Sequence, residues 1–180
     1  MNNIRIFIEG KDDQRFIDNI LTPYILSFSK IRIFPISYAQ KSFNNVDKNI
    51  QKVTANNQSY ILLGDYDSSD DCITLKKQDL IKKYKHLDSD FIFIVKVEID
   101  SWFISGVDTN LKQFREFVIP DNTEEITKEI FNEMWENSHF DSKIDFMMEI
   151  SKSFDFDLAV CRNNSFKFFI EKLNKILKSH

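Results

Sequence analysis

Short apolar runs alternate with helical patterns through the first part of this chain. Four runs have the length and composition of β-strands, and they cover residues 4–8, 31–36, 60–63 and 91–97. Between them, apolar residues recur at helical spacing. These segments predict a helix that carries Phe16 to Ile25, in which Pro23 kinks or divides the chain, and helices over residues 43–53 and 70–85. This alternation is typical of an α/β fold with a mostly parallel, four-stranded sheet flanked by helices.

The pattern changes after Gly106, where only helical periodicity remains. Helices are predicted over residues 111–118, 123–136, 142–151 and 165–178, and Pro120 is expected to end the first of them. We therefore expect an α/β core over residues 1–106 and a helical extension over residues 107–180 that packs on the core, giving one compact domain. In the helix over residues 70–85, the side chains expected to face inward are Ile73, Leu80, Ile81 and Tyr84.

Acidic residues gather where three of the predicted strands end, each group close to one of the three glycines. The groups are Glu9 with Asp12 and Asp13, Asp65 with Asp67, and Glu98 with Asp100. The carboxyl ends of neighbouring parallel strands meet at one edge of a sheet, which is where open α/β folds bind ligands. Several carboxylates in one place stay ionised only if cations lie among them. The sequence therefore predicts a site for divalent metal ions.

The spacing within each group favours shared cations. Asp13, in the first turn of its helix, is expected to project towards the end of the first strand near Glu9. In extended backbone, residues i and i+2 point to the same side, so Asp65 and Asp67 could grip one ion, and Glu98 and Asp100 another. Simpler interpretations remain open for two of the groups. Asp12 and Asp13 could cap a helix while Glu9 is solvated, and Asp65 and Asp67 could form a polar turn.

Composition excludes some classes of protein. The net charge of −4 argues against a generally basic nucleic-acid coat, although bound cations would invert the field locally. Two cysteines, Cys72 and Cys161, make neither a disulfide framework nor a zinc set, and the three histidines have no ligand spacing. The chain begins with a strand-like run, shows no signal peptide, and has no apolar stretch of the ~20 residues that span a membrane. We therefore expect a cytoplasmic protein.

Basic residues near the acidic groups are candidates for holding phosphate. Lys11 follows Glu9 closely, and Arg162 precedes the last predicted helix and could stabilise developing negative charge; Lys167 is a weaker candidate. Alternatively, Lys11 is simply solvated and Arg162 forms a surface ion pair. The lysines at 76–77 and 82–85 are expected to form the solvated side of a helix, with strand binding as the alternative.

The motif Glu9-Gly10-Lys11-Asp12-Asp13 after a strand, followed later by a strand ending in Asp65-Tyr66-Asp67, resembles the Toprim domain of topoisomerases, primases, recombination proteins and nucleases. The segment VEIDSWFISG around Trp102 is similar to an element of OLD-family nucleases and of small stand-alone Toprim-like bacterial proteins. The end of the chain, from Asp157 through Arg162 to Phe169, also resembles those small proteins. The resemblance implies a Toprim-like fold.

The resemblance also implies roles for individual residues. Glu9 matches the family's motif glutamate, acting as metal ligand or as general acid or base, and Asp65 and Asp67 match its paired aspartates. Asp13 and Glu98 match positions of a second metal. Asp100 stands where that group often has glutamate, so it keeps an oxygen ligand with a shorter reach. Two Mg²⁺ or Mn²⁺ ions are expected, which could activate a water and stabilise the leaving oxygen of a phosphodiester.

A metal-dependent nuclease is the leading interpretation. The chain has no room for a domain presenting a catalytic tyrosine, as in topoisomerases, and no zinc module, as in primases. By resemblance, DNA is favoured over RNA as substrate, an ATPase is the expected partner protein, and phage defence or a mobile element is the expected setting. The chain has no P-loop motif, so it supplies no P-loop ATPase of its own. The alternatives are a non-catalytic Toprim-fold module that binds DNA or a protein, and a phospho-receiver domain, which fits the paired aspartates and Glu9 poorly. The sequence does not predict an oligomeric state.

Overall fold

The computed structural model describes residues 3–66 and 72–178. Four parallel strands form one sheet in the order β2-β1-β3-β4, and their bounds are β1 Asn3–Ile8, β2 Arg32–Ser37, β3 Ser59–Asp65 and β4 Ile92–Val95. The predicted α/β class with a parallel four-stranded sheet flanked by helices is therefore confirmed. β1 lies between β2 and β3, so groups at its carboxyl end are within reach of both neighbours.

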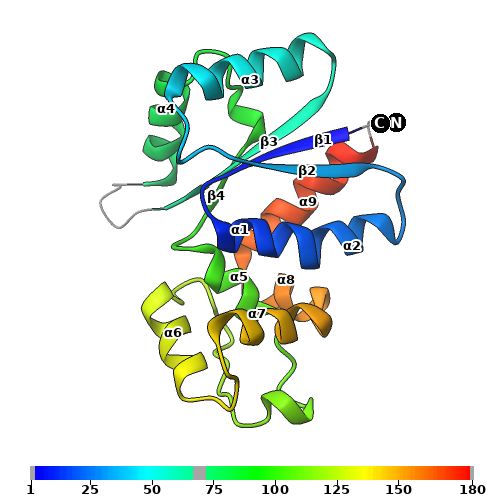
Figure 1. The fold of residues 1–180 in the computed structure, drawn as a ribbon, viewed down its shortest axis with the longest axis vertical. Helices are drawn as coiled ribbons and strands as arrows, with labels where there is room; N and C mark the ends of the chain where they lie inside the picture. The colour runs from blue at the N-terminus through cyan, green and yellow to red at the C-terminus, as the bar shows by residue number, and fades with distance from the viewer. Residues whose placement is uncertain (1–2, 67–71, 179–180) are drawn as a thin grey trace. The chain divides into compact units, whose positions relative to one another are not determined.

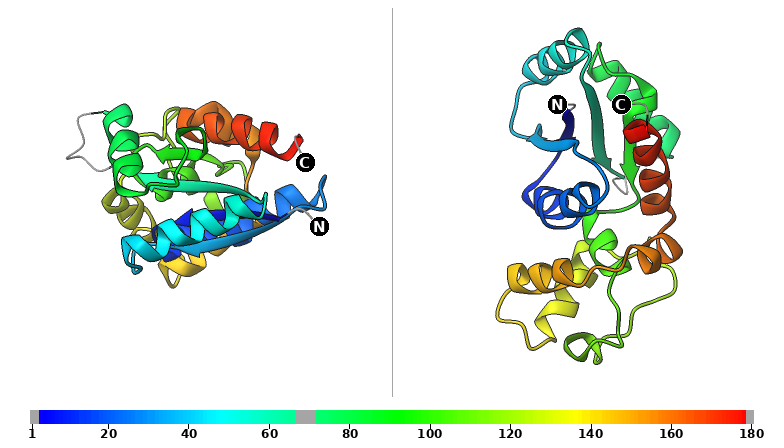
Figure 2. Two further views of the ribbon diagram at one scale, coloured as in Figure 1. Left: turned by 90° about the horizontal axis from the view of Figure 1, so that it is seen from above. Right: turned by 90° about the vertical axis from the view of Figure 1, so that its right-hand side faces the viewer.

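Helices cover both faces of the sheet. The helices α3 (Phe43–Ala55) and α4 (Ile73–Lys83) lie on one face, and the segment from α1 to α2 lies on the other (Figure 1). The right-hand view of Figure 2 shows the same separation of α3 (cyan) from the α1–α2 segment (blue) by the strands. With helices on both sides, the strands are apolar almost throughout, and β4 is buried at all of its positions.

The helix that follows β1 is divided, as the proline predicts. It consists of α1 (Lys11–Phe16), a π-helical turn η1 (Ile17–Leu21) and α2 (Thr22–Leu26). Pro23 lies in the first turn of α2, where its missing N–H is not needed for an intrahelical bond. Just before it, the backbone N–H of Thr22 bonds the carbonyl of Ile17, the wider spacing of a π-turn.

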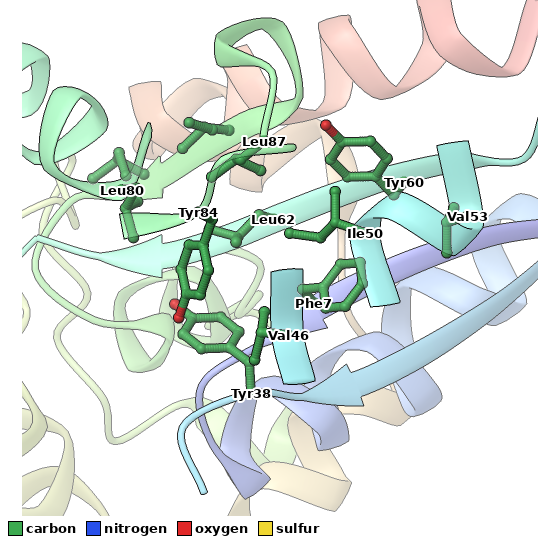
Figure 3. Packing of buried hydrophobic residues seen from close by; sticks show 12 residues of the cluster. Phe7, Tyr38, Val46, Ile50, Val53, Tyr60, Leu62, Leu80, Tyr84 and Leu87 are labelled. Atoms are coloured by element: carbon green, nitrogen blue, oxygen red, sulfur yellow. The ribbon is translucent and has the colours of Figure 1, made fainter. Parts of the chain in front are cut away.

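An apolar cluster between the sheet and the two helices α3 and α4 fixes the position of the strand ends. Phe7 of β1 and Leu62 of β3 lie against Ile50 of α3 (Figure 3), and Leu80 of α4 and Ile94 of β4 belong to the same cluster. Neighbouring residues along each strand face the opposite side, because side chains alternate across a sheet. Burying these apolar surfaces is the main contribution to the stability of this part of the chain.

The inward face predicted for the helix at residues 70–85 is only half right. Leu80 and Tyr84 are buried, whereas Ile73 and Ile81 are 43% and 37% exposed. Helix α4 begins at Ile73 and ends at Lys83, so Ile73 stands in its first turn and Tyr84 caps its end. The apolar stripe is therefore narrower than the sequence pattern indicated.

The helical part of the chain surrounds a short, completely buried helix, α5 (Ile99–Ser105). It contacts α6 (Lys128–Glu136), α7 (Lys143–Lys152) and α8 (Phe156–Arg162), of which α8 was not predicted. The predicted helix over residues 111–118 is wrong: only a 3₁₀ turn, η3 (Lys112–Phe114), forms there. Phe114 alone is fully buried in this stretch, and Val118 is 90% exposed, so no apolar helical face exists.

The predicted helix over residues 123–136 begins later than expected. Thr127 caps α6, and its side-chain oxygen accepts a hydrogen bond from the backbone N–H of Ile130 at 3.4 Å. The preceding residues form a turn instead, in which Thr123 donates its backbone N–H to the carbonyl of Arg162 at 2.9 Å. The last helix, α9 (Asn164–Lys178), agrees with the prediction and buries Phe166, Phe169, Ile170 and Leu173.

The chain forms two compact units. The first comprises residues up to Val95 together with the segment from Leu173, and the second comprises Lys96–Lys172. The chain thus leaves the α/β unit at the end of β4 and returns to it within α9. Whether residues 1–106 and 107–180 behave as core and extension of one domain stays a prediction. Within the described residues, no helix has the length and apolar character needed to cross a membrane.

Candidate functional site

The carboxylate of Glu9 is fixed at the carboxyl end of β1 by groups from both neighbouring strands. Its Oε1 atom accepts a hydrogen bond from the Tyr38 hydroxyl at 2.7 Å and a longer one from the backbone N–H of Asp65 at 3.3 Å. Tyr38 follows β2 directly, and Asp65 is the last residue of β3. The parallel order of the strands therefore brings these groups together, as expected from the sequence.

Tyr38 is a site residue that the sequence analysis missed. Its backbone N–H continues the strand pairing by bonding the carbonyl of Ile8 at 2.9 Å, and its hydroxyl lies 3.0 Å from the carbonyl oxygen of Leu63. Burial, followed by the negative charge of Glu9, raises the pKa of Tyr38 far above its ordinary value, so the hydroxyl keeps its proton and acts as a donor. The role of Tyr38 depends on β2 lying next to β1, which the sequence pattern does not specify.

Asp13 stands in the first turn of α1 and is buried, with 4% of its surface exposed. Its Oδ2 atom accepts a hydrogen bond from the backbone N–H of Gly10 at 2.7 Å. Burial raises the pKa of Asp13 to about 6; the bond from Gly10 works against this rise, and the charge of Glu9 adds to it. The ionised form of Asp13 is therefore unfavourable, and binding a proton or a nearby cation would stabilise this side chain.

Asp65 belongs to β3 itself, not to the turn after it. It pairs with Val95 of β4, and the next residue, Tyr66, donates its backbone N–H to the carbonyl of Val95 at 2.9 Å. The backbone is extended up to this point, as the prediction for a shared cation required. Asp67, the second predicted aspartate of this pair, lies outside the described residues.

The first unit therefore places Glu9, Asp13 and Asp65 at its strand ends. All three carry carboxylate oxygens, the donors that Mg²⁺ prefers in proteins, and burial, with a smaller contribution from the charge of Glu9, raises the pKa of Asp13. These features fit a divalent cation. Among residues 3–66 and 72–178, however, no group of three or more His, Cys, Asp or Glu side chains is arranged to hold a metal ion. The ligand set stays a prediction.

The geometry predicted for Glu98 and Asp100 is wrong. β4 ends at Val95, Glu98 is the N-cap of α5, and Asp100 lies within that helix, so the two residues are not at i and i+2 of one strand. Val97 causes the break, because its φ of 69° turns the chain through the left-handed region. A β-branched residue adopts this conformation only when the surrounding structure imposes it.

Within the second unit, both acids have partners. The Oε2 atom of Glu98 accepts a hydrogen bond from the backbone N–H of Lys128 at 2.5 Å, while burial, above all, raises the pKa of this carboxyl. Asp100 is buried, and its Oδ1 atom lies 2.8 Å from the Nζ atom of Lys143 in an ion pair rather than an aligned hydrogen bond. Lys143 also lies over the ring of Phe131, 4.9 Å from its centroid. A role for Glu98 and Asp100 in metal binding stays a prediction.

The basic candidates differ in exposure and in whether their side chains are hydrogen-bonded within the protein. Lys11 is exposed at the start of α1, and Lys167 is exposed on α9. Arg162 is committed to the fold: its Nη1 atom donates to the carbonyl oxygens of Val107 at 2.6 Å and, less closely, of Ser105 at 3.4 Å. These contacts differ from the surface ion pair that the sequence analysis gave as the alternative, and a role for Arg162 in stabilising developing negative charge stays a prediction.

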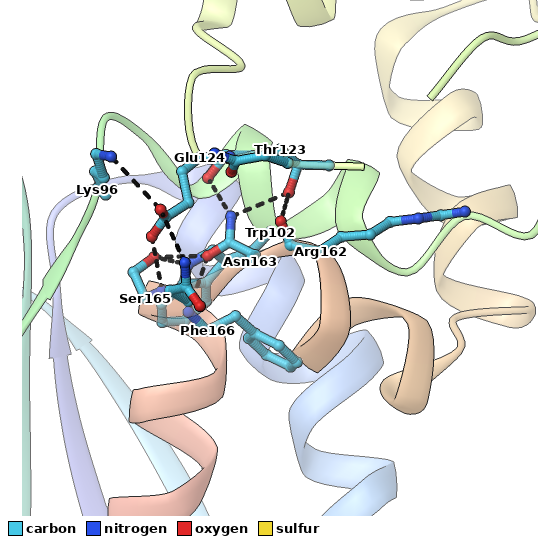
Figure 4. A network of polar contacts seen from close by, with 11 residues as sticks. Lys96, Trp102, Thr123, Glu124, Arg162, Asn163, Ser165 and Phe166 are labelled. Atoms are coloured by element: carbon cyan, nitrogen blue, oxygen red, sulfur yellow. Dashed lines mark hydrogen bonds and ion pairs between the residues drawn. The ribbon is translucent and has the colours of Figure 1, made fainter. Parts of the chain in front are cut away.

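A polar network joins the segment around Trp102 to the start of α9. The Trp102 indole N–H donates to the Ser165 hydroxyl at 2.9 Å, and that hydroxyl donates to Oδ1 of Asn163 at 2.7 Å. The same Oδ1 atom accepts the backbone N–H of Phe166 at 2.9 Å, and Glu124 accepts that of Ser165 at 3.1 Å (Figure 4). These residues cap and anchor a helix; they are a structural element and not a reactive one.

The chain matches no protein-family model, and no curated protein shows significant sequence similarity to it. Its structure is similar to a solved structure of the C-terminal region of the Burkholderia pseudomallei OLD protein, with a TM-score of 0.54. The similarity covers 97% of this chain and 98% of the other at 16% sequence identity. At that identity the two chains share a fold. The fold agrees with the resemblance to the OLD family that the sequence motifs indicated.

Proposed function

We propose that this protein is a metal-dependent nuclease that hydrolyses phosphodiester bonds of nucleic acid, with DNA as the favoured substrate. The observation that carries the proposal is the fixed carboxylate of Glu9, held between Tyr38 and Asp65 at the carboxyl edge of a parallel sheet. That edge is where open α/β folds bind ligands. The fold shared with the C-terminal region of an OLD protein supports the same assignment.

In this proposal, Glu9, Asp13 and Asp65 hold Mg²⁺ or Mn²⁺, together with Asp67, Glu98 and Asp100 by resemblance. When bound, such ions supply an activated water and stabilise the oxygen that leaves phosphorus. The protein's own contribution is positioning. The hydroxyl of Tyr38 fixes one oxygen of Glu9, and the bond from Gly10 fixes one oxygen of Asp13, so the donors are oriented before the substrate arrives.

Lys11 is the proposed contact to a substrate phosphate, because it is exposed at the start of α1, two residues after Glu9. Arg162 is a weaker choice for stabilising the transition state, since its guanidinium is already bound to two backbone carbonyls. A partner ATPase, and a role in phage defence or in a mobile element, follow from the resemblance alone and belong to the proposal.

Cleavage assays test the proposal directly. The purified protein is incubated with single- and double-stranded DNA and RNA in the presence of Mg²⁺ or Mn²⁺. We expect cleavage by the wild type and a loss of about 100-fold or more in Asp65→Ala and Glu9→Gln. Asp79→Ala is the matched control, because Asp79 is exposed on α4 and pairs with Lys82. Cleavage that survives both site variants would overturn the assignment of this site.

Calorimetric titration with Mn²⁺ separates an enzyme from a non-catalytic module of the same fold. The wild type should bind Mn²⁺, and Asp65→Ala should bind it at least about tenfold more weakly, because a carboxylate ligand is lost. A protein that binds nucleic acid equally well with and without Mn²⁺, and releases no heat on titration, would instead be a binding module.

A further inference from the structure

A cleft opens beside Glu9 on the face of the sheet that carries α3 and α4. It has a volume of about 300 Å³, and Glu9 and Tyr38 form part of its wall. The opposite side is supplied by α4, which contributes Leu80 and Lys83, and Lys41 comes from the loop before α3. All of these residues belong to the first unit. The cleft therefore continues directly from the carboxylate that the proposed nuclease uses.

The cleft is basic although the whole chain is acidic. Among the residues that the structure describes, Lys41, Lys76 and Lys83 line it together with one carboxylate, that of Glu9, whereas the chain carries a net charge of −4. Lys41 and Lys83 are exposed. Lysines concentrated in a cleft attract an anionic ligand and raise its local concentration there, even when the protein as a whole is acidic. The charge of the cleft thus fits phosphate groups.

An exposed aromatic ring stands in the same cleft. Phe43 is 58% exposed, and its ring meets that of the buried Tyr84 edge to face, with 6.3 Å between centroids. The Nζ atom of Lys83 lies 4.3 Å from the Phe43 centroid. The ring is thus held in place from below by Tyr84, next to a cation, while much of it faces solvent. In Figure 3, the side chains of Tyr38 and Tyr84 converge, and their hydroxyl oxygens lie close together.

An aromatic ring and lysines side by side are the two elements with which proteins hold unpaired nucleotides. Bases stack on the ring, and the lysines track the phosphates. In a duplex, each base is already stacked between its neighbours, so its flat face is not available to a side chain. Solvating an exposed phenylalanine has no benefit for the fold, whereas stacking with a base would remove its surface from water.

We propose that this cleft, defined by Lys41, Phe43, Lys76 and Lys83, binds a single-stranded segment of nucleic acid that flanks the bond to be cut. The inference rests on the proposed function for the identity of the reaction, since Glu9 is shared by the cleft and the reactive site. Phe43 stacks with one base, and Lys41 and Lys83 contact the adjoining phosphates.

Binding is measured by fluorescence anisotropy with a labelled oligo(dT) strand and with a duplex of equal length, both in EDTA so that no cleavage occurs. The wild type should prefer the single strand. Phe43→Ala should weaken single-strand binding about tenfold, because stacking on one aromatic ring is lost. The double variant Lys41→Gln/Lys83→Gln should weaken it further and reduce the dependence of log Kd on log salt by about 1.4.

Phe28→Ala and Lys30→Gln are the matched controls and should bind as the wild type does. Phe28 is 55% exposed and meets Tyr24 edge to face at 5.1 Å, the same arrangement as Phe43 on Tyr84, and Lys30 is exposed nearby. Urea midpoints of all variants report whether each one folds. Lys83→Gln alone offers a second measurement should Phe43→Ala fail to fold.

The outcomes distinguish the cleft from the nuclease. If Phe43→Ala and the double lysine variant bind the single strand as tightly as the controls do, the inference is wrong, even if the wild type cleaves DNA. If binding is lost in these variants but the wild type cleaves nothing with Mg²⁺ or Mn²⁺, the proposed single-strand site is supported and the proposed nuclease function is wrong. Equal affinity for strand and duplex in every variant would also overturn the inference.

Discussion

At the scale of single residues, the hydroxyl of Tyr38 is the group on which the orientation of Glu9 depends. It has one hydrogen and two acceptors within reach, the Glu9 carboxylate at 2.7 Å and the carbonyl of Leu63 at 3.0 Å. The charged acceptor forms the stronger bond. Tyr38 is thus a positioning residue.

Tyr38→Phe should lower the cleavage rate by about tenfold or more, because one lost hydrogen bond to a charged group costs roughly 1.5–3 kcal/mol. The measurement is kcat on a DNA substrate in Mg²⁺. Tyr60→Phe is the control: Tyr60 is equally buried, and its hydroxyl accepts the backbone N–H of Asp88 away from Glu9. Equal losses of activity in the two variants would reduce Tyr38 to a packing role.

The raised pKa of Asp13 predicts how stability depends on pH without metal. Folding raises this pKa from 3.8 to about 6, so the folded state binds the proton more tightly. The resulting stabilisation is complete below about pH 4 and is lost as the pH rises through 6. Asp13→Asn should therefore be more stable than wild type at pH 8 in EDTA, by at most about 3 kcal/mol, with no gain at pH 4.

Urea denaturation at both pH values measures this difference. Asp18→Asn, at an exposed position in the same segment, is the matched control. Adding Mn²⁺ at pH 8 should stabilise the wild type and not Asp13→Asn, if Asp13 holds the ion as proposed. A destabilised Asp13→Asn at pH 8 would contradict the electrostatic argument.

At the scale of elements, Gly64 and Gly106 differ in the space that is available for a side chain. A Cβ atom at Gly106 would overlap the ring of Phe154, while one at Gly64 would meet its neighbours at ordinary contact distance. Gly106→Ala should therefore destabilise the protein by about 1–3 kcal/mol through overpacking, and Gly64→Ala by clearly less. Thermal or urea unfolding of the pair measures this. Comparable losses would mean that the Phe154 ring can move aside.

The strands and the meeting of Glu9 with Asp65 could be predicted because they follow from local patterns and from the parallel order of a sheet. The geometry of Glu98 and Asp100 could not. It depends on the left-handed turn at Val97, and no residue preference predicts valine in that conformation. Tyr38 was missed for another reason: its role depends on which strand neighbours β1, and that is a property of the sheet order.

The late start of α6 and the missing helix at residues 111–118 share a physical cause. Both sequences have helical spacing, but the surrounding structure does not support a helix in either. Before α6 the backbone is hydrogen-bonded elsewhere, and over residues 111–118 the apolar side chains are not all buried. Thr123 is bound to Arg162 across the chain, and Val118 is almost fully exposed. Tertiary contacts override local propensity in such places, whereas α7 and α9, which bury a continuous stripe, match their prediction.

At the scale of the whole molecule, α9 links the stability of the two units. It buries Phe166 and Phe169 in the second unit, and its segment from Leu173 belongs to the first. Both tryptophans, Trp102 and Trp135, lie in the second unit, so tryptophan fluorescence reports on it alone.

Urea unfolding followed by tryptophan fluorescence should coincide with the loss of hydrogen-exchange protection in β1 and β3, which reports on the first unit. We expect a single transition, because α9 has residues in both units and unfolding either unit removes part of the packing of this helix. The variant Leu173→Ala should shift both signals together, by about 2–5 kcal/mol, since it leaves a cavity in a fully buried site. Two separate midpoints would show that the units unfold independently.

The return of the chain at Leu173 also has a consequence during translation. The strands β1 to β4 leave the ribosome first, yet Leu173 and Leu177, which are buried, are made only after all of Lys96–Lys172. Until then the nascent α/β part carries an uncovered apolar surface. Such surfaces are prone to aggregate and attract chaperones, so the order of synthesis makes the early chain dependent on its late segment.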